Sequence, residues 1–500
     1  MFGSVAVVVT TFSFWAGFHV WVEYVELGKA LPFQEDAQGW DNEETSWSGG
    51  HVGGGTDPRL PWSVRSGIRA AYVGQNYGGG QLPSPVGQGK HAGGQLIASQ
   101  RESIQVPDAG YITAERNLLY ALLAISKKGF QLPDRAVVEL EERLAGVRER
   151  LAGSVGLAEA RRGWERIWSG LTAASEFKTA SWCQQAAIRA ARKSGDVSLR
   201  IANETLAKGP LQKAEYAKAE SMLLWSAAQV LGRSAPESPA QDSSASLRPQ
   251  IASILSSLSS TESLSPEAQR NLFSTLSSLI TLYSARADLP TALSISEAAR
   301  QALSSPAARP DGLTDQLHSA WLQSRYSSVT AYSAEIKRAL KQPEQESLDL
   351  LKSSIGKSES ASELASESGL LSPRTIPGVL RAVLLGSRSD REAERLRKRV
   401  QEVEKEARLA GSNASYLTGL IHELGARKEK LASWCLGDNE ALRQYKAAMQ
   451  FAAGEESELV KGEVPIIDEQ VEEWRKAYNG YQRYALLCQI SSSLNFECID

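Results

Sequence analysis

The histidines and cysteines could hold a metal ion or act as nucleophiles, but none has the spacing that metal centres use. The chain contains no His-Glu-x-x-His, His-x3–5-His or Cys-x-x-Cys pattern. Cys488 and Cys498 have nine residues between them, a weak pattern that two unrelated thiols explain better. The full set is His19, His51, His91, His318, His422, Cys183, Cys435, Cys488 and Cys498. The spacings therefore predict neither a metal ion nor a dithiol redox site.

A glycine-rich stretch that ends at Gly89 and Lys90 is similar to the end of a phosphate-binding loop. That loop requires Gly-x4-Gly-Lys-Ser/Thr after a buried strand. Here Ser84 takes the place of the first glycine, His91 replaces the hydroxyl residue, and no strand pattern precedes. A Gly-x-Ser-x-Gly elbow is missing too. We therefore predict no cofactor and no catalytic role, with an active site assembled from distant residues as the remaining enzymatic alternative.

The charge balance argues against a general affinity for nucleic acids. The 500 residues include 55 Lys and Arg against 58 Asp and Glu, a formal net charge of −3. Serine and alanine are plentiful, and the alternating apolar pattern of strands is missing after residue 12. This length exceeds what one compact core needs. The composition predicts an all-α chain of two or three parts or one elongated stack. We expect other proteins as its partners, on the grounds given below, and no small-molecule substrate.

The N-terminus carries an apolar run over residues 2–22 that contains no Asp, Glu, Lys or Arg. About 20 such residues span a bilayer as a helix. Trp15, Trp21 and Tyr24 suit the aromatic belt of a membrane interface. The run therefore predicts a single retained transmembrane anchor, although a helix buried inside the protein remains an alternative. Lys29 is the only nearby cation, so the orientation of the anchor stays open.

Residues 23–110 are first acidic and then rich in glycine and tryptophan. Each glycine costs a helix about 1 kcal/mol relative to alanine, so this density predicts an extended arm. Trp40, Trp47 and Trp62 are unusual in a plain linker, and we expect them to dock on the helical body or on a partner. The apolar spacing of residues 61–76 predicts a short helix within the arm.

Apolar residues at helical spacing recur through the rest of the chain. They predict helical pairs over residues 111–232, a low-complexity loop over 233–248, and a helical-repeat region over 249–490. A Ser/Glu-rich stretch near 353–372 predicts a mobile loop within that region. Ser389 begins a capping box, and the narrow apolar stripe that follows it predicts either a two-sided surface helix or a dimer contact.

Residues 272–306 have the pattern of a helix, a tight turn and a second helix. A second, partial match follows Gly437. The positions that carry the pattern are Leu279, Tyr283, Asp288, Leu289, Ala292 and Ala299 in the first stretch, and Ala441, Tyr445 and Ala448 in the second. This pattern resembles the tetratricopeptide repeat (TPR), in which small residues let two helices cross closely. Ile280 and Ser296 depart from it, and a generic antiparallel helix pair is the alternative.

The resemblance implies a TPR-like antiparallel solenoid that binds protein segments in its groove. With an N-terminal anchor, this layout is similar to that of membrane-anchored helical-repeat proteins of the fungal mitochondrial type. We therefore expect a scaffold or adaptor in a mitochondrial membrane. The alternative is a structural or assembly subunit of a larger membrane complex, held through the tryptophan-rich arm.

Overall fold

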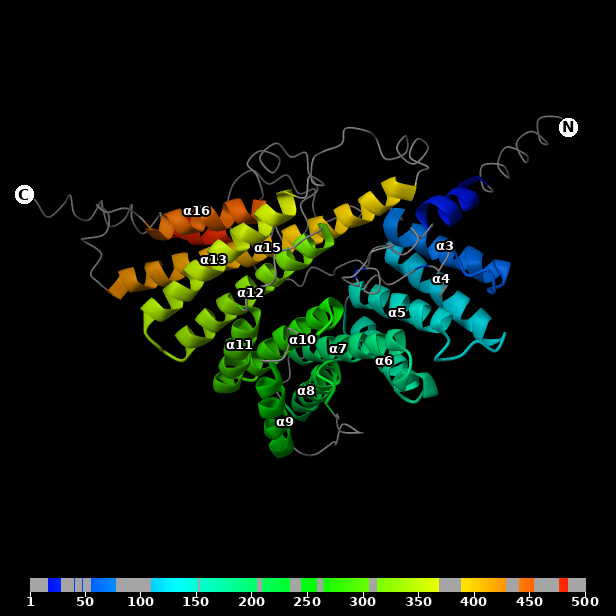
Figure 1. Cartoon of the computed structure of the whole chain (residues 1–500), viewed down its shortest axis with the longest axis horizontal. Coiled ribbons are helices and arrows are strands. Elements are labelled where there is room, and N and C mark those ends of the chain that lie inside the picture. Colours follow the sequence, from blue (N-terminus) through cyan, green and yellow to red (C-terminus); the bar gives the residue numbers. More distant parts are fainter. Residues whose placement is uncertain are drawn as a thin grey trace, which may run out of the picture. The chain divides into compact units, whose positions relative to one another are not determined.

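The computed structural model contains only helices as regular elements in the residues that it describes (Figure 1), which confirms the all-α prediction for that part of the chain. The described residues are 17–27, 40, 47, 55–77, 109–151, 153–204, 209–233, 244–258, 264–304, 313–367, 388–428, 440–453 and 476–483. They fall into two compact units, residues 1–248 and 249–500.

In the first unit, each long helix packs mainly against the next one along the chain. Residues 17–21 are helical and continue into the π-helix η1 (Val22–Glu26). The elements that follow are α3 (Trp62–Tyr77), α4 (Ala109–Ser126), α5 (Arg135–Arg150), α6 (Gly153–Thr172), the 3-10 helix η2 (Ser175–Lys178), α7 (Ser181–Glu204) and α8 (Pro210–Val230). Such serial packing is what stacked helical hairpins produce.

Helices α3 and α4 approach closely because glycine forms part of their contact. A Cβ at Gly74 would lie only 3.0 Å from the carbonyl oxygen of Gly110. Behind this contact the two helices share a core with α5 and with the segments around Leu27 and Leu60. Helix α5 begins at the cap Asp134, whose carboxylate accepts a hydrogen bond from the Ala136 amide at 2.9 Å. The described core residues between Val22 and Val147 therefore form one continuous cluster.

From α10 onward the helices of the second unit also pack in series, with α12 and α15 in contact as well. Its elements are α9 (Ser244–Ser257), which starts just before the boundary, α10 (Pro266–Ala285), α11 (Leu289–Leu303), α12 (Leu313–Ala339), α13 (Glu344–Glu367), α15 (Arg388–Lys428) and α16 (Glu440–Ala453). A further short helix covers residues 476–483.

A seam of small residues at heptad spacing holds α12, α13 and α15 together. Buried residues recur at alternating intervals of three and four on each helix, the spacing of a coiled-coil contact. They are Leu317, Ala320, Ser324, Ser327, Ala331 and Ala334 on α12; Ser347, Leu351, Ser354, Ser358, Ala361 and Ala365 on α13; and Val400, Val403, Ala407, Ala410, Ala414, Leu417 and Ile421 on α15. Since most of these side chains are serine or alanine, the helices can pack closely.

Several serines of this seam hydrogen-bond to the neighbouring helix. The Ser354 hydroxyl lies 2.9 Å from that of Ser327 and donates to the Ser327 carbonyl at 2.9 Å. Ser347 donates to the carbonyl of Ala334 at 3.2 Å, and Ser358 donates to the carbonyl of Ala407. Buried hydroxyls satisfied in this way do not incur the penalty of an unpaired polar group.

This seam corrects two predictions. The mobile loop expected near 353–372 is wrong for residues 353–367, because α13 continues through them; residues 368–372 lie outside the described part. The stripe at Val400, Val403 and Ala407 is buried within this chain's own second unit, where α15 packs on α12 and α13. Serine is a weak helix former in isolation, but tertiary packing overrides that preference here.

The N-terminal predictions need correction as well. Residues 2–16 of the expected anchor lie outside the described part, and within the described residues no helix is long and apolar enough to cross a membrane. Val22, expected at the end of the anchor, is fully buried in the protein core. The arm expected over 23–110 is not extended where it is described, because η1, α3 and the start of α4 fall within it. Residues 244–248 of the expected low-complexity loop belong to α9.

Candidate partner-binding surfaces

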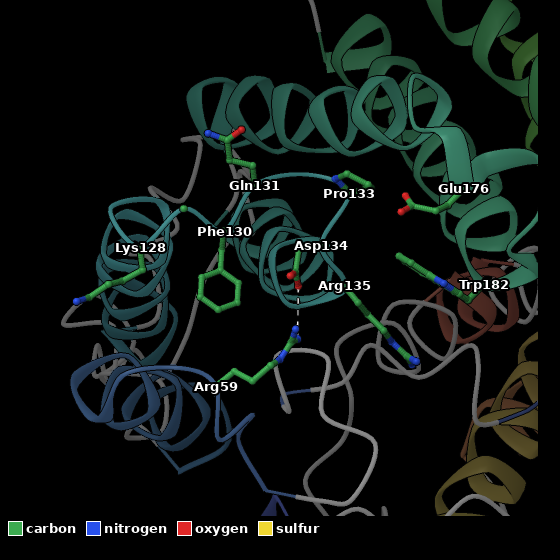
Figure 2. Close-up of a pocket in the computed structure, with 10 residues that line it drawn as sticks. Arg59, Lys128, Phe130, Gln131, Pro133, Asp134, Arg135, Glu176 and Trp182 are labelled. Carbon is green, nitrogen blue, oxygen red and sulfur yellow. Dashed lines mark ion pairs between the residues drawn. The ribbon is translucent and has the colours of Figure 1, made fainter.

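A hollow of about 610 Å³ opens in the first unit between the α4–α5 connection, the start of α5, η2 and the start of α7. Its walls combine cations, carboxylates and aromatic rings. Figure 2 shows Lys128 and Phe130 on one side and Glu176 and Trp182 on the other. The lining residues are Arg59, Lys128, Gly129, Phe130, Gln131, Pro133, Asp134, Arg135, Glu176 and Trp182.

Ion pairs and ring contacts fix the cations of this hollow. Arg59 donates to the Asp57 carboxylate at 2.7 Å, and its guanidinium lies 5.7 Å from the centre of the Phe130 ring. The Asp57 hydrogen bond raises the pKa of Arg59. Arg135 lies 5.9 Å from the centre of the Trp182 ring. Lys128 stands exposed at the rim. Aromatic rings beside guanidinium groups form a surface that can bind a peptide carrying both apolar and acidic side chains.

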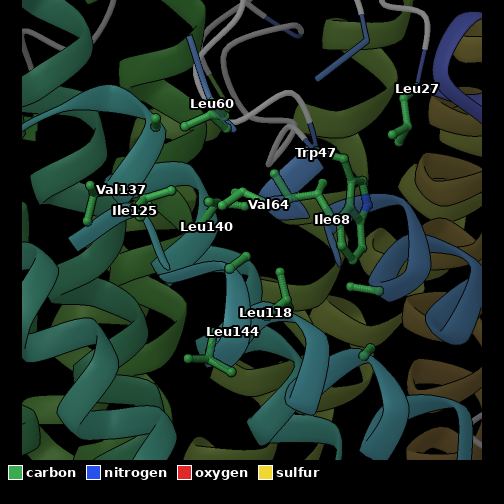
Figure 3. Packing of buried hydrophobic residues seen from close by; sticks show 14 of the residues in the cluster. Leu27, Trp47, Leu60, Val64, Ile68, Leu118, Ile125, Val137, Leu140 and Leu144 are labelled. Carbon is green, nitrogen blue, oxygen red and sulfur yellow. The ribbon is translucent and has the colours of Figure 1, made fainter. Parts of the chain in front are cut away.

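Two of the three tryptophans expected to dock lie inside the fold. Trp47 is buried beside Val64 and Ile68 (Figure 3), and its ring meets Tyr72 edge-on at 5.6 Å. The Arg143 guanidinium lies 4.7 Å from the centre of the Trp47 ring. Trp47 therefore docks on the chain's own helical body.

Trp40 is also buried, whereas the third tryptophan, Trp62, is 57% exposed. The Arg69 guanidinium packs on the Trp62 ring, 4.3 Å from its centre. Of the three, Trp62 alone presents most of its surface to a partner.

A buried ionic cluster joins the N-terminal helix to α3. Glu23 is 4% exposed, and its carboxylate accepts hydrogen bonds from Arg65 at 2.7 Å and from Arg69 at 2.9 Å. The Thr56 amide and hydroxyl donate to the same carboxylate at 3.0 and 2.8 Å. Gly55, at φ +73°, lets the backbone turn against Glu23. The cluster fastens the helix of residues 17–26, which contains the end of the apolar run, to α3.

The electrostatics of the cluster favour the ionised carboxylate. Burial by itself raises the pKa of Glu23, but the hydrogen bonds from Arg65 and Thr56 and the charge of Arg69 outweigh it. The pKa of Glu23 therefore lies below its ordinary value. Burial lowers the pKa of Arg69, and the Glu23 carboxylate opposes that shift. Neither charge is stable in this position without the other.

The helix–turn–helix predicted in the second unit is present as α10 and α11. Asp288 caps α11 through a hydrogen bond from the Thr291 amide, and Ala287 adopts φ +58° in the turn. Leu279 and Tyr283 on α10 are buried, as are Ala292 and Ala299 on α11. Leu289 is partly buried at the start of α11. These contacts suit a repeat unit, but a generic helix pair would share them, so membership of the TPR family stays a prediction.

The second set of signature residues gathers around a buried tyrosine. Ala441, Tyr445 and Ala448 are buried on α16, which packs on α15. The Tyr445 hydroxyl donates to Glu423 on α15 at 2.7 Å, and Arg483 donates twice to the same carboxylate, at 2.9 and 2.7 Å. Burial and the Glu423 hydrogen bond raise the pKa of Tyr445. This cluster attaches the short helix 476–483 to the α15–α16 pair.

Sequence reasoning missed both ionic clusters, because their members are far apart along the chain. Glu23 and Arg69 are 46 residues apart, and Glu423 and Arg483 are 60 apart. The one available signal was the position of Glu23 as the first charge after a long uncharged run. In the residues that the structure describes, no three His, Cys, Asp or Glu side chains form a group able to hold a metal ion.

Comparison of the chain with protein-family models, with curated proteins and with solved structures finds no match. The surfaces described above are therefore the basis on which a function can be argued.

Proposed function

We propose that this chain is a membrane-tethered helical scaffold or adaptor of TPR-like type that binds protein partners. In this proposal the uncharged run that begins at residue 2 and ends before Val22 crosses a mitochondrial membrane once, and the helical units bind partner segments. The observation that carries the proposal is the Glu23 cluster. It joins the helix that follows an uncharged apolar run to a folded body through a buried carboxylate and two arginines.

The joint supports a tether because it holds the body at a set orientation to the helix. A flexible linker would leave the body free to tumble. Here Val22 is in the core, and Glu23 is buried directly after it. A scaffold gains from this arrangement, because a body that is already ordered loses less conformational entropy when a partner binds.

The hollow of the first unit is the candidate site for a partner segment. Its rim carries Lys128, and its walls carry Phe130, Arg135 and Trp182. Aromatic and arginine side chains contribute most to binding energy at protein interfaces. We propose that the bound segment is a peptide with an apolar side chain next to an acidic one.

A photo-crosslinking amino acid at Gln131, in the exposed part of the hollow, tests this proposal. The matched control carries the same group at Leu211, an exposed residue of α8 in the same unit. We expect one partner to be crosslinked at Gln131 and not at Leu211, and we expect Lys128→Glu to abolish the crosslink. Equal crosslinking at both sites, or an unchanged crosslink with Lys128→Glu, would contradict the hollow as the binding site.

The tether is tested by microscopy of the full chain and of a chain without residues 1–16, each with a C-terminal fluorescent tag. We expect the full chain to mark mitochondria and the shortened chain to be cytosolic. A full chain found in the cytosol would refute the membrane tether and leave the crosslinking result to decide the scaffold role alone.

The alternative function is an assembly subunit held through the arm, and fewer tryptophans support it than the sequence suggested. Trp40 and Trp47 are buried, so Trp62 is the tryptophan of the three that a complex could bind. Deletion of the arm would remove α3 and break the core, so the better test is Trp62→Ala. Loss of co-migration with a large complex would favour this alternative, and unchanged co-migration would argue against it.

A further inference from the structure

The exposed apolar side chains of the described residues are concentrated on three neighbouring elements. Of ten large hydrophobic residues that are exposed, seven lie on the helix from residue 17, on α3 or on α4. The seven are Phe18, Val20, Tyr24, Trp62, Ile112, Tyr120 and Leu123. Single exposed hydrophobic residues are normal, but a concentration of this kind marks an interaction surface.

Helix α4 contributes the part of this surface that most needs a cover. Residues 118–125 are eight consecutive apolar residues, so this half of the helix is apolar on every side. A helix that is apolar all round is normally buried all round. Yet Tyr120 is 53% exposed and Leu123 is 63% exposed. With Ile112 they fall within an arc of about 80° on the outer face of α4.

Basic residues border this outer face. Arg116 is exposed within the same arc, and Lys127 and Lys128 are exposed directly after the helix. An apolar helical face bordered by long basic side chains is typical of a helix that lies in the headgroup region of a bilayer. Tyrosine and tryptophan favour the same region.

The geometry of the first unit connects this face to the N-terminal helix. The Tyr120 ring packs on α3, where a Cβ at Gly67 would lie 3.5 Å from Tyr120 Cδ1. On α3, Trp62 lies 6.4 Å from the His19 ring, measured between ring centres. Arg65 and Arg69 of α3 bind Glu23. One packed layer therefore carries both the end of the apolar run and the outer face of α4.

We propose that the outer face of α4 is a second membrane-contact surface, which rests in the headgroup region beside the N-terminal anchor. Lipid is the occupant because, in the sequence, the uncharged residues 2–16 directly precede the helix of this same layer, and because the surface carries aromatic and basic residues together. The inference rests on the proposed tether and adds to it: the first unit lies against the bilayer through Tyr120, Leu123 and Ile112, about 5–10 Å deep.

The test uses the full chain reconstituted in vesicles of mixed neutral and anionic phospholipids. An environment-sensitive fluorophore is attached at Leu123→Cys, at Tyr120→Cys, or at the control Leu211→Cys, which is exposed on α8. In all three proteins Cys435, Cys488 and Cys498 are changed to serine, and the remaining Cys183 is buried. All three labelled positions are exposed. Because the Tyr120 ring also contacts α3, the comparison of the labels at 123 and 211 decides the result.

We expect vesicle flotation of all three proteins. The labels at 120 and 123 should shift to the blue, be quenched by nitroxides on the lipid, and be protected from iodide in the water. The label at 211 should show the opposite. A floating chain whose 123 label behaves as the 211 label overturns the inference and leaves the tether intact.

Two further outcomes also overturn it. Protection of the 123 label from iodide without quenching by lipid nitroxides would mean that protein covers α4, either a second copy or another segment of this chain. Failure of the full chain to float would refute the tether and the α4 contact together.

Discussion

Replacement of Glu23 by glutamine removes the charge that two arginines share beneath the N-terminal helix. Arg69 is 2% exposed, so the substitution leaves a buried guanidinium without its carboxylate. Breaking a buried ion pair on one side costs about 3–5 kcal/mol. The amide can still accept hydrogen bonds from Thr56, and Arg65 is partly exposed. We therefore take the lower end, about 3 kcal/mol.

A loss of that size makes local opening of α3 about two orders of magnitude more frequent. Hydrogen exchange of peptides from residues 62–77 measures it directly, because unfolding of the second unit does not enter the signal. The control is Glu440→Gln, which breaks the exposed ion pair with Arg443 at the start of α16. It should change the exchange protection of α16 by about 1 kcal/mol or less. The double variant Glu23→Gln with Arg69→Met should lose less exchange protection of α3 than the sum of the losses in the two single variants.

The Glu23 cluster also predicts how the stability of α3 changes with pH. The pKa of Glu23 is lower in the folded than in the unfolded chain. Its contribution to stability is therefore complete above the unfolded pKa and is lost as pH falls through the folded one. Protection of α3 should fall at acid pH in the parent chain more than in Glu23→Gln. Additive losses of α3 protection in the double variant would refute the argument from a buried ion pair. Equal acid sensitivity of α3 in the parent chain and in Glu23→Gln would refute it as well.

Three further changes test the second unit. Gly480→Val should release the short helix 476–483, because a Cβ at residue 480 would lie 2.6 Å from Tyr445 Cε1. Faster proteolysis of this helix measures the release. The control Gly356→Ala, which has open space around it, should leave the helix attached. Burial lowers the pKa of His318 to about 3, so an NMR titration should show a neutral imidazole at pH 5. The free energy of unfolding of this unit should decline as pH falls below 6.5, because the unfolded chain then binds more protons than the folded chain. Asp288→Ala should cost about 1 kcal/mol in chemical denaturation by removing the cap of α11, and no change would contradict that cap.

Local patterns in the sequence were enough for most helices. The tight turn and the apolar spacing within residues 272–306 predicted α10 and α11 because both signals are short-range. The same reasoning failed at residues 353–367. There, serine and glutamate predicted a loop, but Ser354 and Ser358 are satisfied by α12 and α15. A hydrogen bond to a distant helix leaves no trace in the local composition.

The candidate surfaces were harder to predict for the same reason. Trp47 was expected to dock, but nothing near it in the sequence shows that Tyr72 and Arg143 receive it. The hollow brings Arg59, Phe130 and Trp182 together from three separate parts of the chain. Pairings of this kind depend on how α3, α4, α5 and α7 pack, which periodicity alone does not determine.

The serine and alanine seam of α12, α13 and α15 also constrains how this chain can change over generations. Its small side chains fill the space between helices, so nearly every replacement adds volume, and overpacking costs about 1–3 kcal/mol per site. Ser327 and Ser354 have the further demand that a hydroxyl remain. Inherited variation in the second unit should therefore collect on the outer faces of these helices. At seam positions other than Ser327 and Ser354, replacements should be tolerated mainly as exchanges between serine and alanine.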